Sequence, residues 1–148
     1  MFAGRITHGA LLFLDGVCAL FLPAEKIAEH RGVGQRGERE AYFFLRKRGY
    51  TMVAQNFRSP RRHGEIDLIG WDGDTLCFIE VKTRRSRDAS PAESAVDKKK
   101  RKDVIAVARE FLRNLPPECP WRFDLVGVYY DGADARAQFE LFTDVLPL

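Results

Sequence analysis

Glu80 and Lys82 stand two residues apart in the stretch CFIEVKTRR, where most of the other side chains favour a buried β-strand. Because side chains alternate along a strand, Glu80 and Lys82 share one face while Ile79 and Val81 point to the other. A carboxylate and an ammonium on one face are common as a surface ion pair. What chemistry they can do therefore depends on the residues that a neighbouring strand brings opposite them.

Asp67 lies in the preceding strand-like run, EIDLIGW, and only DGD separates the two runs, which predicts a β-hairpin. A loop of even length pairs Leu68 with Ile79 and brings Asp67 opposite Glu80, with Cβ atoms about 4.5–5.5 Å apart. An odd loop without a bulge would put the two carboxylates on opposite faces. Directly opposed carboxylates destabilise a hairpin and raise each other's pKa unless a cation neutralises them.

Oxygen ligands at this spacing suit Mg²⁺, which proteins hold through one or two carboxylates together with waters and the phosphate oxygens of a substrate. Lys82, on the same face, would lie beside the ion, where it could position the attacking water or balance charge on the phosphate. The chemistry that these three side chains predict is metal-assisted hydrolysis of a phosphodiester.

The surrounding sequence predicts the elements that position these residues. A helix is expected in EREAYFFLRKRGY, ending at Gly49, then a strand in YTMVAQNFR and a loop in SPRRHG. After the hairpin come a long polar loop, a helix within residues 97–115, and two strands in RFDLVGVYY and AQFELFTDV. The second helix permits a crossover connection. The predicted fold class is therefore α/β, a central mixed β-sheet flanked by helices.

The first 33 residues differ from the rest. The apolar run ALLFLDGVCALFLP is interrupted by Asp15 and Gly16, and it is shorter than the roughly 20 apolar residues of a membrane span. It also lacks a convincing cleavage site for a secretory signal. We expect an extra amphipathic or buried helix, or an extension from an upstream start codon, joined by a polar connector, AEKIAEHRGVGQRG. The predicted organisation is an N-terminal extension, 1–33, and one domain, 34–148.

The cysteines and the charged residues indicate which kinds of protein this sequence resembles in composition. The three cysteines are far apart and form no C-x-x-C pair, which disfavours a disulfide framework or a structural zinc site and fits a reducing cytoplasm. The net charge is only +3, but the cations are clustered as in proteins that bind a phosphate backbone. The three clusters are Arg58, Arg61 and Arg62; Lys82, Arg84, Arg85 and Arg87; and Lys98 to Lys102.

Four ordered blocks, GEREAYFFLRKRGY, NFR, HGEIDLI and FIEVKTR, closely resemble the YraN-like family of small bacterial proteins. The resemblance extends to the PD-(D/E)xK nucleases and their archaeal Holliday-junction resolvases, and it covers about residue 34 to the C-terminus. It implies a restriction-endonuclease-like core, Mg²⁺ as cofactor with Mn²⁺ as a substitute, and DNA, branched at a junction or flap, as substrate. A homodimer would follow, because resolvases cut two strands.

Carried over by position, Asp67 and Glu80 match the metal-binding carboxylates of these nucleases, and Lys82 matches the catalytic lysine. Glu38, in the first predicted helix, matches the additional acidic residue of the resolvase-like branch and would bind a second metal or a water. Ile66 stands where the motif has proline, and we expect its side chain to face the core.

Other residues have weaker claims to the site. Glu65 is either an outer ligand or an exposed residue at the start of a strand. Glu40 lies about 200° around the helix from Glu38, so only one of them can face the site. Candidate contacts to the nucleic-acid backbone are Arg58, Arg61, Arg62, Arg84 and Lys98.

Three functions remain open from the sequence. The first is a Mg²⁺-dependent endonuclease acting on DNA. The second is a non-catalytic nucleic-acid-binding protein with the same fold. The third is an adaptor of a DNA-processing complex that docks through the apolar N-terminal segment.

Overall fold

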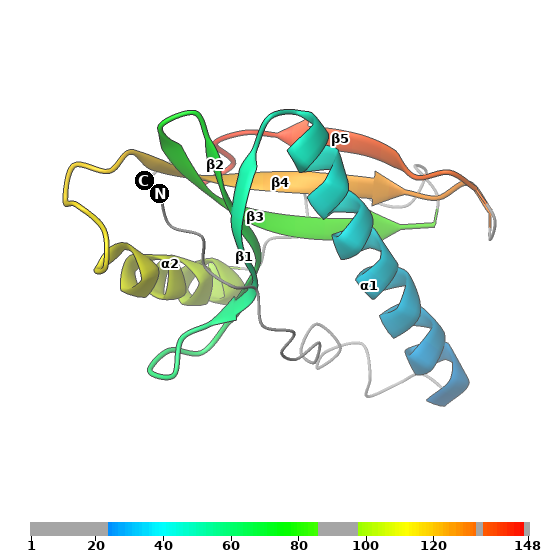
Figure 1. Cartoon of the computed structure of the whole chain (residues 1–148). Helices are drawn as coiled ribbons and strands as arrows, with labels where there is room; N and C mark the ends of the chain where they lie inside the picture. Colours follow the sequence, from blue (N-terminus) through cyan, green and yellow to red (C-terminus); the bar gives the residue numbers. More distant parts are fainter. Residues whose placement is uncertain (1–23, 86–97, 133–134, 147–148) are drawn as a thin grey trace.

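The structure of the chain, a computed structural model, describes residues 24–85, 98–132 and 135–146 (Figure 1). In chain order its elements are α1 (Ala24–Lys47), β1 (Thr51–Arg58), β2 (Glu65–Asp72), β3 (Thr75–Arg84), α2 (Lys98–Leu112), β4 (Trp121–Tyr129) and β5 (Gln138–Phe142). The predicted order of helix, three strands, helix and two strands is confirmed.

The five strands form one sheet in the order β1-β2-β3-β4-β5. The β3–β4 pair is parallel and the other three pairs are antiparallel, so the predicted mixed sheet is confirmed. Parallel neighbours need a long crossover, and α2 lies within the connection between β3 and β4. The fold is the α/β arrangement expected of a restriction-endonuclease-like core.

The β2–β3 hairpin has the register that the sequence predicted. Leu68 pairs with Ile79, and the ladder continues to Asp72 and Thr75 at the turn. Two residues therefore form the loop, and the first of them, Gly73, has a φ of 58°. Glycine adopts this backbone conformation without the steric cost that other residues meet.

Each helix covers one face of the sheet and closes its own hydrophobic core (Figure 1). On the α1 side the buried residues include Ala41, Leu45, Leu68, Ile79 and Val126. On the α2 side they include Ile66, Ile69, Phe78, Val107 and Phe123. The rings of Phe78, Phe111, Trp121 and Phe123 lie in edge-on or tilted contact on the α2 side.

Helix α1 is longer than the sequence predicted. It begins at Ala24, so the segment AEKIAEHRGVGQRG, which we predicted to be a connector between the extension and the domain, is part of this helix. Its glycines each cost about 1 kcal/mol in a helix, but most of the residues between them are strong helix formers. The helix also crosses the predicted boundary between residues 33 and 34.

The apolar run of residues 10–23 lies outside the described residues, and so does most of the predicted polar loop after β3. Neither described helix has the length and apolar character of a membrane-spanning segment.

Candidate active site

The site lies where β2 and β3 diverge. Their ladder ends at the Leu68–Ile79 pair, one residue before Asp67 would face Glu80. Alternation also fails here, because Ile66 and Ile69 both pack on the α2 side, although an odd spacing would put them on opposite faces of a regular strand. The direct cross-strand pair that we predicted between the two carboxylates is therefore replaced by an irregular junction.

The Asp67 carboxylate occupies the gap that this irregularity opens. Its Oδ2 accepts a hydrogen bond of 2.7 Å from the backbone N–H of Val81, and Asp67 is only 2% exposed. Burial raises the pKa of Asp67 well above its usual range, and the nearby carboxylates of Glu80 and Glu38 raise it further. Asp67 is thus a buried acidic group held in place by main chain, with two other carboxylates and the Lys100 ammonium nearby.

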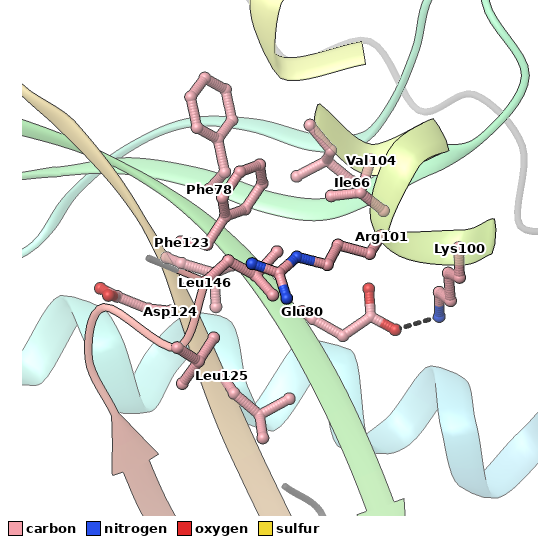
Figure 2. A pocket seen from close by; sticks show the side chains of 12 residues that line it. Ile66, Phe78, Glu80, Lys100, Arg101, Val104, Phe123, Asp124, Leu125 and Leu146 are labelled. Atoms are coloured by element: carbon pink, nitrogen blue, oxygen red, sulfur yellow. Dashed lines mark hydrogen bonds and ion pairs between the residues drawn. The ribbon is translucent and has the colours of Figure 1, made fainter. Parts of the chain in front are cut away.

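Glu80, on β3, is held by two lysines. Its Oε1 accepts a hydrogen bond of 2.7 Å from Lys82 Nζ and a second one from Lys100 Nζ, which reaches it from α2 (Figure 2). Burial alone would raise the pKa of Glu80, but the two ammonium groups outweigh it and lower that pKa. Glu80 is therefore ionised, and Lys82 lies beside it as predicted.

Lys100 was missed by the sequence analysis, which chose Lys98 from the same run of cations. Lys98 begins α2, and its side chain lies outside the described part of the chain. The helical spacing contained the missing signal. Lys100 precedes Val104 by four residues and Val107 by seven, so it shares the face of α2 that packs on the sheet.

Glu38 approaches the site from α1. Burial raises its pKa to about 7, together with the negative charges of Glu65 and Glu80. Asn56 of β1 lies between two of these acids. With its amide nitrogen turned toward them, Asn56 Nδ2 is 3.0 Å from Glu65 Oε1 and 3.3 Å from Glu38 Oε2. The backbone of Asn56 has a φ of 48°, a left-handed conformation that asparagine tolerates better than most residues.

Two further contacts set which face of α1 meets the site. Glu40, the alternative to Glu38, forms an ion pair of 2.8 Å with Arg36 and does not share the position of Glu38. Gly37 packs so closely on β3 that an added Cβ would lie 2.0 Å from Thr83 Oγ1. The missing side chain at this position lets α1 carry Glu38 close to the end of β3.

The predicted nucleic-acid contacts lie in different surroundings. Arg58 makes a double hydrogen bond to Glu65, with Nη2 at 2.5 Å and Nε at 3.0 Å from Oε2, so Glu65 is a partner of this arginine. Arg61 is largely exposed and pairs with Glu110 at 3.1 Å. Arg62 lines a surface hollow on α2, and Arg84 donates to the carbonyl of Thr83. Their contact with nucleic acid stays a prediction.

The donor set of the site fits a hard divalent cation. Across residues 24–85, 98–132 and 135–146, no three His, Cys, Asp or Glu side chains form a metal-binding group. Asp67 and Glu80 supply two carboxylates, and Mg²⁺ typically takes one or two from a protein and completes its shell with water and phosphate. Burial first, and then the neighbouring carboxylates, raise the pKa values of Asp67 and Glu38, and a bound cation would stabilise their ionised forms. Glu38 as a further ligand stays a prediction.

Comparison with known proteins identifies relatives over most of the chain. The model of the uncharacterised protein family UPF0102 matches residues 37–128. A UPF0102 protein of Koribacter versatilis is 53% identical over 125 residues, which are 84% of this chain and 85% of that protein. A UPF0102 protein of Solibacter usitatus is 43% identical over 115 residues, 74% of this chain and 86% of that protein. The matched region contains every element of the site.

Proposed function

This chain belongs to the UPF0102 (YraN) family, which lies within the restriction-endonuclease-like superfamily, and we propose that it is a divalent-metal-dependent endonuclease that hydrolyses phosphodiester bonds in DNA. The observation that supports the proposal is the convergence of Asp67, Glu80 and Lys82 where β2 and β3 diverge. Paired acids held against like charge make poor structural filler, and they suit a site that binds a cation.

Asp67 and Glu80 would hold Mg²⁺, or Mn²⁺ in its place. When bound, the cation polarises a phosphoryl oxygen and makes a bound water more acidic. Asp67 is oriented for this role because the N–H of Val81 binds Oδ2, which leaves Oδ1 for the ion. Glu38, whose carboxylate lies within reach of the Asn56 amide, would bind a water or a second ion at the edge of the site.

Lys82 would act on the reacting phosphate. Its ammonium lies 2.7 Å from Glu80 Oε1, and its side chain is 13% exposed, so the charge stays at the site in a partly desolvated position. There it balances negative charge that develops on the phosphate or orients the attacking water. The basic residues Arg58, Arg61, Arg62, Arg84 and Lys98 would contact the DNA backbone. We propose branched DNA as the substrate, a homodimer as the active form and the cytoplasm as the location.

A cleavage panel tests the proposal. Purified full-length protein would be incubated with junction, flap, linear duplex and single-stranded DNA, and with RNA of the same sequences, in Mg²⁺, Mn²⁺ or a chelator. We expect metal-dependent cleavage that falls at least about 100-fold in Asp67→Asn, Glu80→Gln and Lys82→Met. Glu118→Gln, which removes an exposed carboxylate in the connection between α2 and β4, is the matched control and should cleave normally.

The same panel separates the alternatives. Cleavage that survives Asp67→Asn and Glu80→Gln would reject the site assignment. Binding that weakens steeply with salt, without cleavage in any divalent metal, would replace the nuclease by a non-catalytic nucleic-acid-binding protein. Neither binding nor cleavage would favour an adaptor, and deletion of the first 33 residues would then test docking through the N-terminal segment.

A further inference from the structure

The Glu80 carboxylate is paired with two ammonium groups. Two ammonium groups, Lys82 Nζ and Lys100 Nζ, donate to the same oxygen, Oε1, although one cation suffices to neutralise one carboxylate. The second ammonium also faces Asp67, whose carboxylate is close enough to interact with Lys100. Counted at full ionisation, Asp67, Glu80, Lys82 and Lys100 therefore carry no net charge before any ion binds.

That balance changes when a divalent cation and a phosphodiester enter. The cation adds two positive charges. In hydrolysis the water oxygen loses a proton and forms a bond to phosphorus, the bond from phosphorus to the leaving sugar oxygen breaks, and that oxygen takes up a proton. Attack of hydroxide on a phosphodiester gives a transition state with two negative charges. With both lysines present, the four side chains, the cation and the transition state are again neutral, which is the condition for strong stabilisation in a dry site.

The two lysines differ in the element that carries them and in the exposure of their side chains. Lys82 belongs to β3, where it pairs with Gly127 of β4 in the parallel ladder, so its Cα is fixed within the sheet. Lys100 reaches the site from the first turn of α2, and its side chain is 30% exposed against 13% for Lys82. Of the two, Lys100 is thus the ammonium with access to solvent and to an approaching ligand.

The surroundings of Lys100 also fix the direction in which it can move. The Glu80–Lys100 pair borders a pocket lined mainly by apolar side chains, among them Ile66, Phe78 and Val104, and also by Arg101 (Figure 2). An ammonium that leaves Glu80 cannot enter this apolar space without a large desolvation cost. It must turn outward, toward the open side of the site.

We propose that Lys100 is a second catalytic lysine, which neutralises Glu80 while no divalent cation is bound and contacts a non-bridging oxygen of the scissile phosphate once a cation takes its place. The substrate contact rests on the proposed nuclease function. The exchange at Glu80 does not, because it concerns only the protein and the metal.

Metal affinity without DNA tests the exchange. Mn²⁺ would be titrated calorimetrically into the full-length wild type, Lys100→Met and Lys102→Met. Lys102 is exposed on the same helix, so Lys102→Met makes the same change in charge without the contact to Glu80. We expect Lys100→Met to bind Mn²⁺ about five- to tenfold tighter than wild type, and Lys102→Met to stay within about twofold. Equal or weaker binding by Lys100→Met would overturn the inference.

Cleavage kinetics test the substrate contact. A contact made in the transition state predicts that Lys100→Met lowers kcat by about 100-fold with little change in KM, and that Lys100→Arg restores part of the loss. A purely structural role would instead lower the melting temperature of both variants without tighter Mn²⁺ binding. If Lys100→Met fails to fold, Lys100→Gln and Lys100→Arg carry the same comparison.

The outcomes separate the two proposals. A wild type that cleaves, with Lys100→Met cleaving at the same rate, overturns the role of Lys100 and leaves the nuclease standing. A wild type that cleaves no substrate overturns the nuclease and the phosphate contact together. A wild type that does not bind Mn²⁺ overturns both proposals.

Discussion

Two buried aspartates, Asp67 on β2 and Asp124 on β4, have opposite electrostatic surroundings. Asp124 is 1% exposed, and Arg122 Nε donates to both of its oxygens at 2.9 and 3.1 Å. The backbone N–H of Asp144 also donates to it, at 3.0 Å. Asp67 is similarly buried but accepts its hydrogen bond from the main chain of Val81, and its charged neighbours are the carboxylates of Glu80 and Glu38 together with Lys100. Asp124 is hydrogen-bonded directly to an arginine, whereas Asp67 has no hydrogen bond to a cation within the described residues.

The two regions share one local pattern. Glu80 and Lys82 alternate on β3 as Arg122 and Asp124 alternate on β4, so each strand carries an acid and a base on one face. The difference lies in the third partner. Arg122 Nη2 also donates to Asp72 at 2.7 Å and thereby ties the hairpin turn to β4. In the candidate site, the further partners of Glu80 and Lys82 are an acid, Asp67, and a second lysine, Lys100.

We call Tyr50, Asp72, Arg122 and Asp124 the Arg122 network. The charged groups of the Arg122 network are paired with one another. Its hydrogen bonds to Asp124 and Asp72 raise the pKa of Arg122, so the guanidinium stays charged. Burial raises the pKa of Tyr50 to about 12, with Asp124 adding to the effect, so this hydroxyl stays protonated and can accept from Arg122 Nη2 at 3.1 Å. A network of paired charges stabilises the fold. The site around Asp67 would instead be stabilised by binding a cation. The predictions that follow test this distinction.

The largest effect on stability should come from the Arg122 network. Asp124→Ala would leave the Arg122 charge without its buried partner and should lower the free energy of unfolding by about 3–5 kcal/mol. Urea denaturation followed by circular dichroism measures it. A loss below about 1 kcal/mol would mean that Asp124 does not anchor this network, and the comparison would fail on its structural side.

A divalent metal should stabilise the protein by binding at Asp67 and not at Asp124. For a site that binds only the folded chain, Mg²⁺ or Mn²⁺ at 100 times its dissociation constant should raise the free energy of unfolding by about 2.7 kcal/mol, and a chelator should remove the gain. Asp67→Asn should abolish this response, whereas Asp124→Asn should keep it from a lower baseline. Equal responses in the two variants would show that any bound metal lies elsewhere.

Close packing of α1 on β3 should matter next. Gly37→Ala places a Cβ against Thr83 and should cost about 1–3 kcal/mol, with weaker metal binding because Glu38 moves. Gly34→Ala, on the same helix with open space around it, is the control and should stabilise by about 0.5–1 kcal/mol. Adding Thr83→Ala to Gly37→Ala should recover part of the loss. Without that recovery, the contact would not be what limits this position.

The smallest effect should be a gain. Without metal, Asp67→Asn removes a charge from among like charges and keeps an oxygen that can accept from Val81. We expect it to be as stable as the wild type or more stable by up to about 1 kcal/mol. Thermal unfolding in a chelator measures it. A loss as large as that of Asp124→Asn would erase the distinction between the two aspartates.

Local patterns were enough to predict much of the fold. Alternation and the DGD turn signal predicted the hairpin, and the Leu68–Ile79 register followed on the condition of an even loop, which the structure has. The helix before β4 predicted a mixed sheet. The end of the ladder at Asp67 could not be predicted, because the irregularity depends on a side chain replacing a main-chain partner. The early start of α1 was missed because three glycines outweighed the helix formers around them.

The charged residues were harder to assign than the elements. A base and an acid two positions apart on a strand look alike in the site and in the Arg122 network, and only residues distant in sequence tell them apart. Asp72, which completes the Arg122 network, was seen in the sequence only as part of a turn. Lys100 was hidden within five consecutive cations, of which helix geometry turns this one to Glu80.

The short hairpin has a consequence for how the site comes into being. Asp67, Glu80 and Lys82 lie within 16 residues joined by one tight turn, and local pairings of this kind form far sooner than contacts across a crossover. Asp67 and Glu80 should therefore come close together early in folding, before β4, α1 and α2 pack on the hairpin. A divalent ion present during synthesis would meet this pair before Lys100 does, and magnesium should accelerate refolding of the wild type but not of Asp67→Asn.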